Sequence, residues 1–292
     1  MSKRTSLLRG NNGRAFLTYL KEIGVPFEMI CSNYTTVFKI DGLERKFVNS
    51  MQSKRVFACF AKIKSDLKKK AIPVIDYEQL RYFVHDFKKN EHIGDVINVD
   101  MKSAYATILY NDGFIRKETY EYICKGPKQE RLVAVGMLAS KKQHFVFDKG
   151  KIISNDEIVS DTANFFYYAV MRTAEIMGQL KKLCKDAYLF TWVDGIYLRP
   201  DVKALERIEK YITSIGYPYS TEWLRDFSVR ISSKQATVDF LKMVKGEWVK
   251  KPFNLPLVNT EFKRLVIEAI LINSKSKNNE TILDQISKGK SK

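Results

Sequence analysis

The alternation of apolar and polar residues divides the first third of the chain into short strands and one helix. Segments 25–30 (VPFEMI) and 34–40 (YTTVFKI) are rich in β-branched and aromatic residues, and Asp41-Gly42 follows them as a turn signal. Residues 51–70 predict a helix that ends in Lys68, Lys69 and Lys70. The pattern therefore predicts a small mixed α/β region over residues 1–94.

Residues 95–240 show a second, longer series of elements. The stretch DVINVDM begins as an apolar strand and changes to helical spacing after Asp100. A long helix is predicted for residues 162–183, and AYLFTWVDGIYL reads as two strands that meet at Val193-Asp194-Gly195. Further strands are predicted at LVAVGML (132–138), HFVF (144–147), FSVRISS (227–233) and ATVDFL (236–241). The expected fold class is α+β, an antiparallel sheet with helices on one face.

The remaining residues, 241–292, are basic and hold one helix candidate at 260–273. Their end is polar and lysine-rich, so we expect it to be mobile. Three parts are therefore expected, over residues 1–94, 95–240 and 241–292.

The charge balance indicates a polyanionic partner. The 292 residues include 50 Lys and Arg against 33 Asp and Glu, which gives a net charge of +17. A membrane surface is the alternative polyanion, but no segment approaches the roughly 20 apolar residues of a membrane span. Because the first residues also lack an apolar signal core, we expect an intracellular, cytoplasmic protein that binds nucleic acid and no membrane.

Four cysteines, Cys31, Cys59, Cys124 and Cys184, lie far apart in the sequence. No CxxC pair occurs among them, so neither a zinc site nor a disulfide framework is indicated. We expect reduced thiols in the core.

Two aspartates stand where solubility does not require them. Asp100 ends an apolar strand, and Asp194 lies at the tip of an apolar hairpin. Carboxylates on neighbouring strands can bridge two Mg²⁺ ions roughly 3.5–4 Å apart, as phosphoryl transfer to a 3′ hydroxyl requires. Taken singly, each aspartate also fits a simpler role, Asp100 as a helix N-cap and Asp194 as a turn residue.

The sequence around both aspartates resembles family B DNA polymerases. Residues 100–106 (DMKSAYA) are similar to motif A of that family, DxxSLYP, and residues 190–196 (FTWVDGI) are similar to motif C, YxDTDS. Asp194 matches the second aspartate of motif C, whereas Trp192 replaces the first aspartate and Gly195 replaces the serine. The helix before motif C also resembles the palm helix of the family, and the resemblance covers residues 95–240.

The resemblance implies a polymerase palm in which Asp100 and Asp194 are the catalytic, metal-binding residues. It implies two Mg²⁺ ions, for which Mn²⁺ can substitute, and a short C-terminal thumb. The backbone that follows Asp100 would cradle the triphosphate, through Met101, Ser103, Ala104 and Tyr105. The ring of Tyr105 would exclude a ribose 2′ hydroxyl, although core packing is the alternative role. Glu222 and Lys234 resemble the DNA-contacting elements that follow motif C, and Lys68, Lys69 and Lys70 are further candidates for phosphate contact.

Two features depart from the family pattern. The fingers motif KxxxNSxYG is absent between Gly113 and Thr162, so other cations would hold the triphosphate. By position Lys141 and Lys142 are the first candidates, ahead of Arg116 and Lys117, and surface charge is the alternative reading of all four. The first 94 residues also show no strand with a DxE pattern, so no proofreading exonuclease is predicted.

The sequence therefore predicts a template-directed DNA polymerase that adds deoxynucleotides to a 3′ hydroxyl. Its partners would be a DNA template and primer, a dNTP, and other replication proteins that supply missing functions. Two alternatives stay open. A reverse transcriptase is one, because Trp192-Val193-Asp194-Gly195 is close to YxDD, and a catalytically silent nucleic-acid-binding replication subunit is the other.

Overall fold

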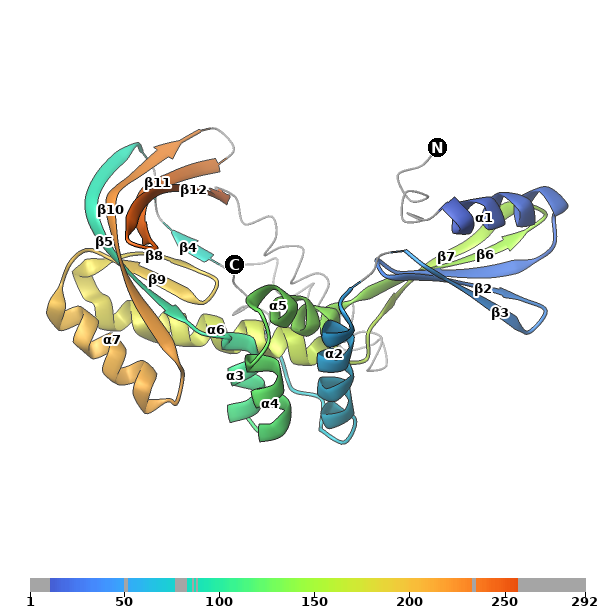
Figure 1. Ribbon diagram of the computed structural model, residues 1–292, viewed down its shortest axis with the longest axis horizontal. Helices are drawn as coiled ribbons and strands as arrows, with labels where there is room; N and C mark the ends of the chain where they lie inside the picture. The colour runs from blue at the N-terminus through green and yellow to red at the C-terminus, as the bar shows by residue number, and fades with distance from the viewer. Residues whose placement is uncertain are drawn as a thin grey trace, which may run out of the picture. The chain divides into compact units, whose positions relative to one another are not determined.

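The chain forms two compact units, each assembled from separate stretches of sequence. The computed structural model describes residues 11–49, 52–76, 83–85, 87, 89–232 and 235–256 (Figure 1). The first unit comprises Met1–Lys69 and Glu121–Phe166, and the second comprises Lys70–Tyr120 and Tyr167–Lys292. This division differs from the expected boundaries at residues 94 and 240, because the later strand β6 returns to pair with β1, and β7 pairs with β6.

The first unit contains a five-stranded antiparallel sheet in the order β3-β2-β1-β6-β7. Its strands are β1 (Phe27–Cys31), β2 (Thr35–Ile40), β3 (Leu43–Val48), β6 (Lys141–Asp148) and β7 (Lys151–Val159), and helix α1 is Asn11–Ile23. Leu17 and Leu20 of α1 belong to a core with Phe38, Phe145 and Phe147 of the sheet. Three strands predicted from sequence in this unit are thereby confirmed, at 25–30, 34–40 and 144–147.

The turn between β2 and β3 is the one predicted at Asp41-Gly42. Both residues have positive φ, 47° and 79°, as a two-residue type I′ turn requires. Glycine adopts such a φ without steric cost, and aspartate tolerates it better than most residues. The dipeptide therefore fixes the register of this hairpin.

Three helices and a short 3₁₀ turn complete the first unit and the segment that leads into it. Helix α2 (Lys54–Leu67) begins at Ser53, whose Oγ accepts a hydrogen bond from the Val56 N–H at 3.2 Å. Helix α4 spans Lys117–Cys124, helix α5 spans Lys128–Gly136, and the 3₁₀ turn η3 spans Met137–Ala139.

The strand predicted at 132–138 is wrong, because these residues belong to α5 and η3. A short apolar run does not distinguish a strand from a buried helix, and here Pro127 at the N-cap introduces a helix that buries Ala134 and Val135.

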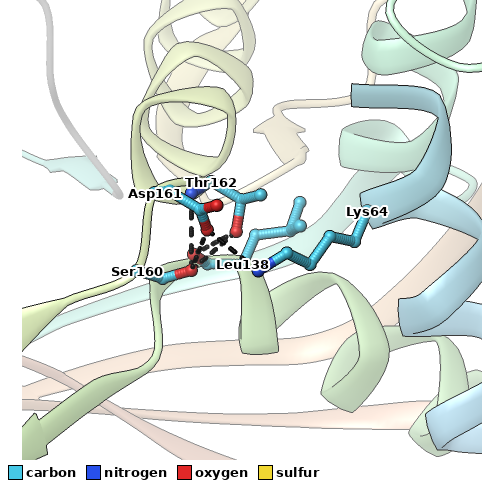
Figure 2. Close-up of polar contacts among 5 residues, drawn as sticks. All are labelled: Lys64, Leu138, Ser160, Asp161 and Thr162. Atoms are coloured by element: carbon cyan, nitrogen blue, oxygen red, sulfur yellow. Dashed lines mark hydrogen bonds and ion pairs between the residues drawn. The ribbon is translucent and has the colours of Figure 1, made fainter. Parts of the chain in front are cut away.

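Helix α6 (Ala163–Cys184) begins at a small polar cluster, which Figure 2 shows. The Thr162 hydroxyl donates to the Leu138 carbonyl at 3.1 Å and lies 2.8 Å from Ser160 Oγ. Beside them, Lys64 Nζ donates to Asp161 Oδ1 at 3.1 Å. These contacts fix the start of the long helix that the sequence predicted at 162–183.

The second unit is built on a seven-stranded antiparallel sheet in the order β12-β11-β10-β5-β9-β8-β4. Its strands are β4 (Phe83–His85), β5 (Glu91–Met101), β8 (Tyr188–Trp192), β9 (Gly195–Leu198), β10 (Tyr219–Ile231), β11 (Gln235–Val244) and β12 (Glu247–Pro256). Strand β12 was not predicted, because its Pro and Lys residues weaken the strand pattern. The helix candidate at 260–273 lies outside the described residues.

The two faces of this sheet have different coverings. On one face, Ile97 and Val99 of β5 belong to a core with α3 (Ala104–Asn111), α6 and α7 (Val202–Ser214). A short 3₁₀ turn, η4 (Lys185–Ala187), follows α6. The opposite face carries an aromatic cluster that includes Phe190, Phe227 and Phe240. Figure 1 shows α6 and α7 along one side of the sheet, and the α+β class with an antiparallel sheet is confirmed.

All four cysteines are free thiols, and Cys31, Cys59 and Cys184 are buried. Burial raises the pKa of the Cys184 thiol to about 12, which keeps it protonated at neutral pH. Over the part of the chain that the structure describes, no helix is long and apolar enough to cross a membrane.

Candidate active site

The two candidate catalytic aspartates lie at the same end of the second unit's sheet, Asp100 on β5 and Asp194 in the turn that leads into the neighbouring strand β9. Asp100 of β5 is paired opposite Gly195 of β9, the residue that follows Asp194. One residue further on, the Met101 N–H donates to the Asp194 carbonyl at 2.9 Å. This hydrogen bond joins the two sequence motifs directly, so residues almost a hundred positions apart form one site.

Asp194 lies in a two-residue turn with an unusual backbone conformation. Trp192 pairs with Gly195, so Val193 and Asp194 are the two central residues of the β8–β9 turn. The hairpin predicted at 193–195 is present, but Gly195 already belongs to strand β9 and leaves the positive φ to Val193, at 53°. A β-branched residue rarely adopts this conformation, and such strained residues gather at functional sites.

Asn98 and Asp100 point to the face of the sheet opposite the helices. Successive side chains of a strand alternate between faces, and Ile97 and Val99 belong to the helix-side core. Asn98 lies between Tyr197 of β9 and Glu222 of β10 in the register of the sheet. The polar residues at positions 98 and 100 therefore form a short polar row on a face that is otherwise aromatic.

Tyr197 lies beside this row, on the neighbouring strand β9 opposite Asn98. Its ring stacks on Phe190 with centroids 4.2 Å apart and planes 9° apart. Burial raises the pKa of the Tyr197 hydroxyl, and the negative charges of Asp100, Glu222 and Asp194 raise it further. The phenol therefore stays protonated at neutral pH, with three carboxylates around it.

Gly195 leaves a small space between the oxygens of this site. A Cβ added at Gly195 would lie 3.3 Å from Asn98 Oδ1, 3.4 Å from Asp100 Oδ1 and 3.5 Å from the Trp192 carbonyl oxygen. Asn98 is 8% exposed, and within the described part of the chain its Oδ1 has no hydrogen-bond partner. Two side-chain oxygens thus converge on the space that the absence of a side chain creates.

The donors that the site offers to a cation are all oxygens. Within the described residues, no three His, Cys, Asp or Glu side chains gather into a group. Asp100 and Asp194 are both half-buried. Oxygen donors without sulfur or imidazole suit a hard cation such as Mg²⁺ or Mn²⁺ better than they suit zinc.

The segment after Asp100 turns sharply into helix α3. The Lys102 N–H donates to the Pro218 carbonyl at 2.7 Å, and Ser103 has a positive φ of 54° without a side-chain cap bond. Because the Met101 N–H bonds to Asp194, the backbone donors that remain for a triphosphate are those at the start of α3. Ala104 is buried in the helix-side core, and Tyr105 is half-buried against the same core.

The remaining predicted residues are distributed over both units. Glu222, which pairs with Asn98 across the sheet, accepts a hydrogen bond from Lys242 Nζ at 2.7 Å. In the first unit, Lys141 Nζ lies 3.0 Å from Glu157 Oε1, and Lys142 is the next residue of strand β6. Lys68, Lys69 and Lys70 follow helix α2 and are exposed, whereas Lys234 lies outside the described residues.

Asn98, Tyr197 and the space at Gly195 were not predicted from the sequence as parts of the site. A signal existed in the strand VINVDM, where Asn98 and Asp100 are polar residues at a spacing of two in an apolar run. The contact of both with Gly195 depends on the register of β5 against β9, which local sequence does not determine.

Comparison with known proteins gives a distant likeness of fold. No protein-family model matches the chain, and no curated protein matches it. Two solved structures of phi29 DNA polymerase are similar. The complex with single-stranded DNA has 11% identity and a TM-score of 0.40, over 73% of this chain and 61% of that one. The ternary complex with primer-template DNA and incoming nucleotide has 9% identity and a TM-score of 0.41, over 73% and 62%. The chain thus spans about three fifths of the length of the polymerase chains that it matches.

Proposed function

We propose that this chain is a template-directed DNA polymerase whose catalytic residues are Asp100 and Asp194. The observation that carries the proposal is the hydrogen bond from the Met101 N–H to the Asp194 carbonyl, beside the pairing of Asp100 with Gly195. It joins the motif A and motif C resemblances at one end of an antiparallel sheet with helices on its other face. The two motifs thus lie at one place. A helix cap at Asp100 and a turn residue at Asp194 would not by themselves require that proximity.

Asp100 and Asp194 would hold two Mg²⁺ ions, with Mn²⁺ as a substitute. The site fits these cations because its donors are carboxylate and amide oxygens. When bound, such ions lower the pKa of the attacking hydroxyl and stabilise the charge on the phosphates.

The chain's own contribution is to bind and orient the reactants. The first N–H groups of α3 have no acceptor within the helix, and the helix dipole favours an anion there, so Ser103, Ala104 and Tyr105 would hold the triphosphate. The primer 3′ oxygen then forms a bond to the α-phosphorus as the bond to pyrophosphate breaks, and the hydroxyl proton passes to solvent. Correct alignment of these atoms is the main catalytic effect of the protein.

Nucleic-acid binding would rest on phosphate contacts. The net charge of +17 and the exposed Lys68, Lys69 and Lys70 favour a backbone contact without sequence preference. Lys234 and Glu222 would contact the primer and template, and Lys141 and Lys142 would help to hold the triphosphate. Other replication proteins would supply the fingers and proofreading functions, whose motifs are not found in this sequence.

Purified protein is expected to extend a primed DNA template when all four dNTPs and Mg²⁺ are present. A chelator should abolish the extension, and an excess of Mg²⁺ or Mn²⁺ should restore it, because the two aspartates act through the ions. Product length on a denaturing gel is the measurement. Extension that is faster on an RNA template would favour the reverse transcriptase alternative, and DNA binding without extension would favour the silent subunit.

Tyr105→Ala is expected to raise the ratio of ribonucleotide to deoxynucleotide incorporation roughly tenfold or more. The half-buried ring would no longer occupy the space of the 2′ hydroxyl, while the aspartates stay in place. Kinetics of single-nucleotide addition with dATP and ATP measure the ratio. Tyr110→Ala is the matched control, because Tyr110 lies on the same helix and stacks on Tyr120. A folded, active Tyr105→Ala protein with an unchanged ratio would assign Tyr105 to core packing alone.

A further inference from the structure

Asn98 is a buried polar residue whose side-chain oxygen has no hydrogen-bond partner among the residues that the structure describes. The side chain is 8% exposed, in the centre of a strand whose neighbours Val96, Ile97 and Val99 are fully buried. Its Oδ1 accepts no hydrogen bond from any described residue. Buried carbonyl oxygens are nearly always paired, and an unpaired one lowers stability. An apolar side chain of the same size would avoid that cost, so the presence of this oxygen favours a binding partner other than the described residues.

The position of this oxygen indicates what the partner is. Asn98 Oδ1 and Asp100 Oδ1 lie 3.3 and 3.4 Å from the point where a Gly195 Cβ would stand. The φ of Gly195 lies outside the left-handed region, so its backbone does not demand glycine. A side chain at this position would instead intrude on the two oxygens. The arrangement leaves both oxygens facing one space beside Asp194.

The surrounding charges favour a cation in that space. Lys242 forms an ion pair with Glu222 of β10. Glu222 and Tyr197 lie on opposite sides of Asn98 in the sheet, so this ammonium group is on the β10 side of Asn98. Trp192, at the end of β8, places an indole ring near Phe253 and contributes no side-chain oxygen.

We propose that the Asn98 carboxamide oxygen is a third side-chain donor to the divalent cation that Asp100 and Asp194 hold. This inference rests on the proposed function, because it requires a cation at the two aspartates. Asn98 supplies a neutral oxygen, so it adds a ligand without adding to the repulsion between carboxylates. A cation bound in this space would explain both the Asn98 oxygen without a hydrogen-bond partner among the described residues and the glycine at position 195.

Binding of Mn²⁺ to the full-length protein tests the proposal without reliance on activity. Free Mn²⁺ is measured by electron paramagnetic resonance during titration of wild type, Asn98→Leu, Asn98→Asp and Asp100→Asn, and the melting temperature of each is recorded. Asn98→Leu should weaken Mn²⁺ binding about tenfold or more, as loss of a ligand or of its support does. Its melting temperature should stay the same or rise, because an unpaired buried oxygen is removed. Asn98→Asp should bind Mn²⁺ at least as tightly as wild type.

Thr191→Val is the matched control. Thr191 is also a buried polar residue of this sheet, on β8 opposite Ile196, which belongs to the helix-side core. Its replacement should leave Mn²⁺ affinity unchanged, which separates an effect of burial from an effect of the cation site.

The outcomes distinguish the inference from the proposed function. Asn98→Leu that binds Mn²⁺ like wild type, while Asp100→Asn does not, would overturn the role of Asn98 and leave the aspartate site intact. Equal binding by wild type and Asp100→Asn would overturn the aspartate site and the inference with it. If Asn98→Leu does not fold, the test is made with Asn98→Asp, which keeps an oxygen at this position. Weaker Mn²⁺ binding by folded Asn98→Asp than by wild type would contradict the proposal.

Discussion

Asp194→Asn and Asp100→Asn are each expected to lower nucleotide incorporation by at least about 10²-fold while the melting temperature changes little. Asparagine keeps the shape of aspartate but removes the charge that holds the cations, so the loss falls on stabilisation of the transition state. Single-turnover extension of a primed template measures the rate, and a DNA-binding titration checks that affinity is retained. Because the Met101 N–H bonds to the carbonyl of Asp194 and not to its side chain, the turn should survive the substitution.

Asp41→Asn provides the control for this comparison. Asp41 also precedes a glycine in a two-residue hairpin turn, but it belongs to the first unit and to the β2–β3 hairpin. Its substitution should leave incorporation unchanged. If Asp194→Asn extends primers at the rate of Asp41→Asn, the catalytic role of Asp194 is wrong.

Phe190→Ala is expected to destabilise the second unit by about 3–5 kcal/mol, the second large effect. Phe190 is fully buried, stacks on Tyr197 and contacts Phe227 and Phe253 at centroid distances of 6.0 and 6.1 Å. Its removal would leave a cavity beside Tyr197, the neighbour of Asn98, so activity should be lost together with structure. Urea denaturation followed by tryptophan fluorescence measures the change in free energy of unfolding.

Phe57→Ala is the comparison for the aromatic truncation. Phe57 lies on α2 in the first unit and is 42% exposed, so its loss should cost much less. A Phe190→Ala protein as stable as Phe57→Ala would contradict the central place of the aromatic cluster in this unit.

Local patterns were sufficient for much of the secondary structure and insufficient for its assembly. The strands on both sides of Asp194 and the long helix after Asp161 followed from apolar periodicity, and Asp41-Gly42 followed from turn chemistry. The helix α5 was mistaken for a strand because its apolar run is short. The return of β6 to β1 involves residues more than a hundred positions apart, and no local signal announces such a pairing.

The candidate site shows the same limit. Asp100 and Asp194 were found because short motifs surround them, and their proximity was an expectation that the register of β5 with β9 explains. Asn98 has no motif around it, and a single polar residue in an apolar strand has many possible reasons. The proposed role of Asn98 depends on its position beside Gly195. The sequence predicted Gly195 as part of a turn, whereas the structure has it as the first residue of strand β9.

The most direct test of template-directed synthesis is the identity of the first nucleotide that wild-type protein adds. Four primed DNA templates that differ only in the first unpaired base are each incubated with one labelled dNTP at a time and Mg²⁺. Each template should accept its complementary nucleotide and reject the other three. Addition of the same nucleotide to all four templates, or addition to none by folded protein, would contradict the account.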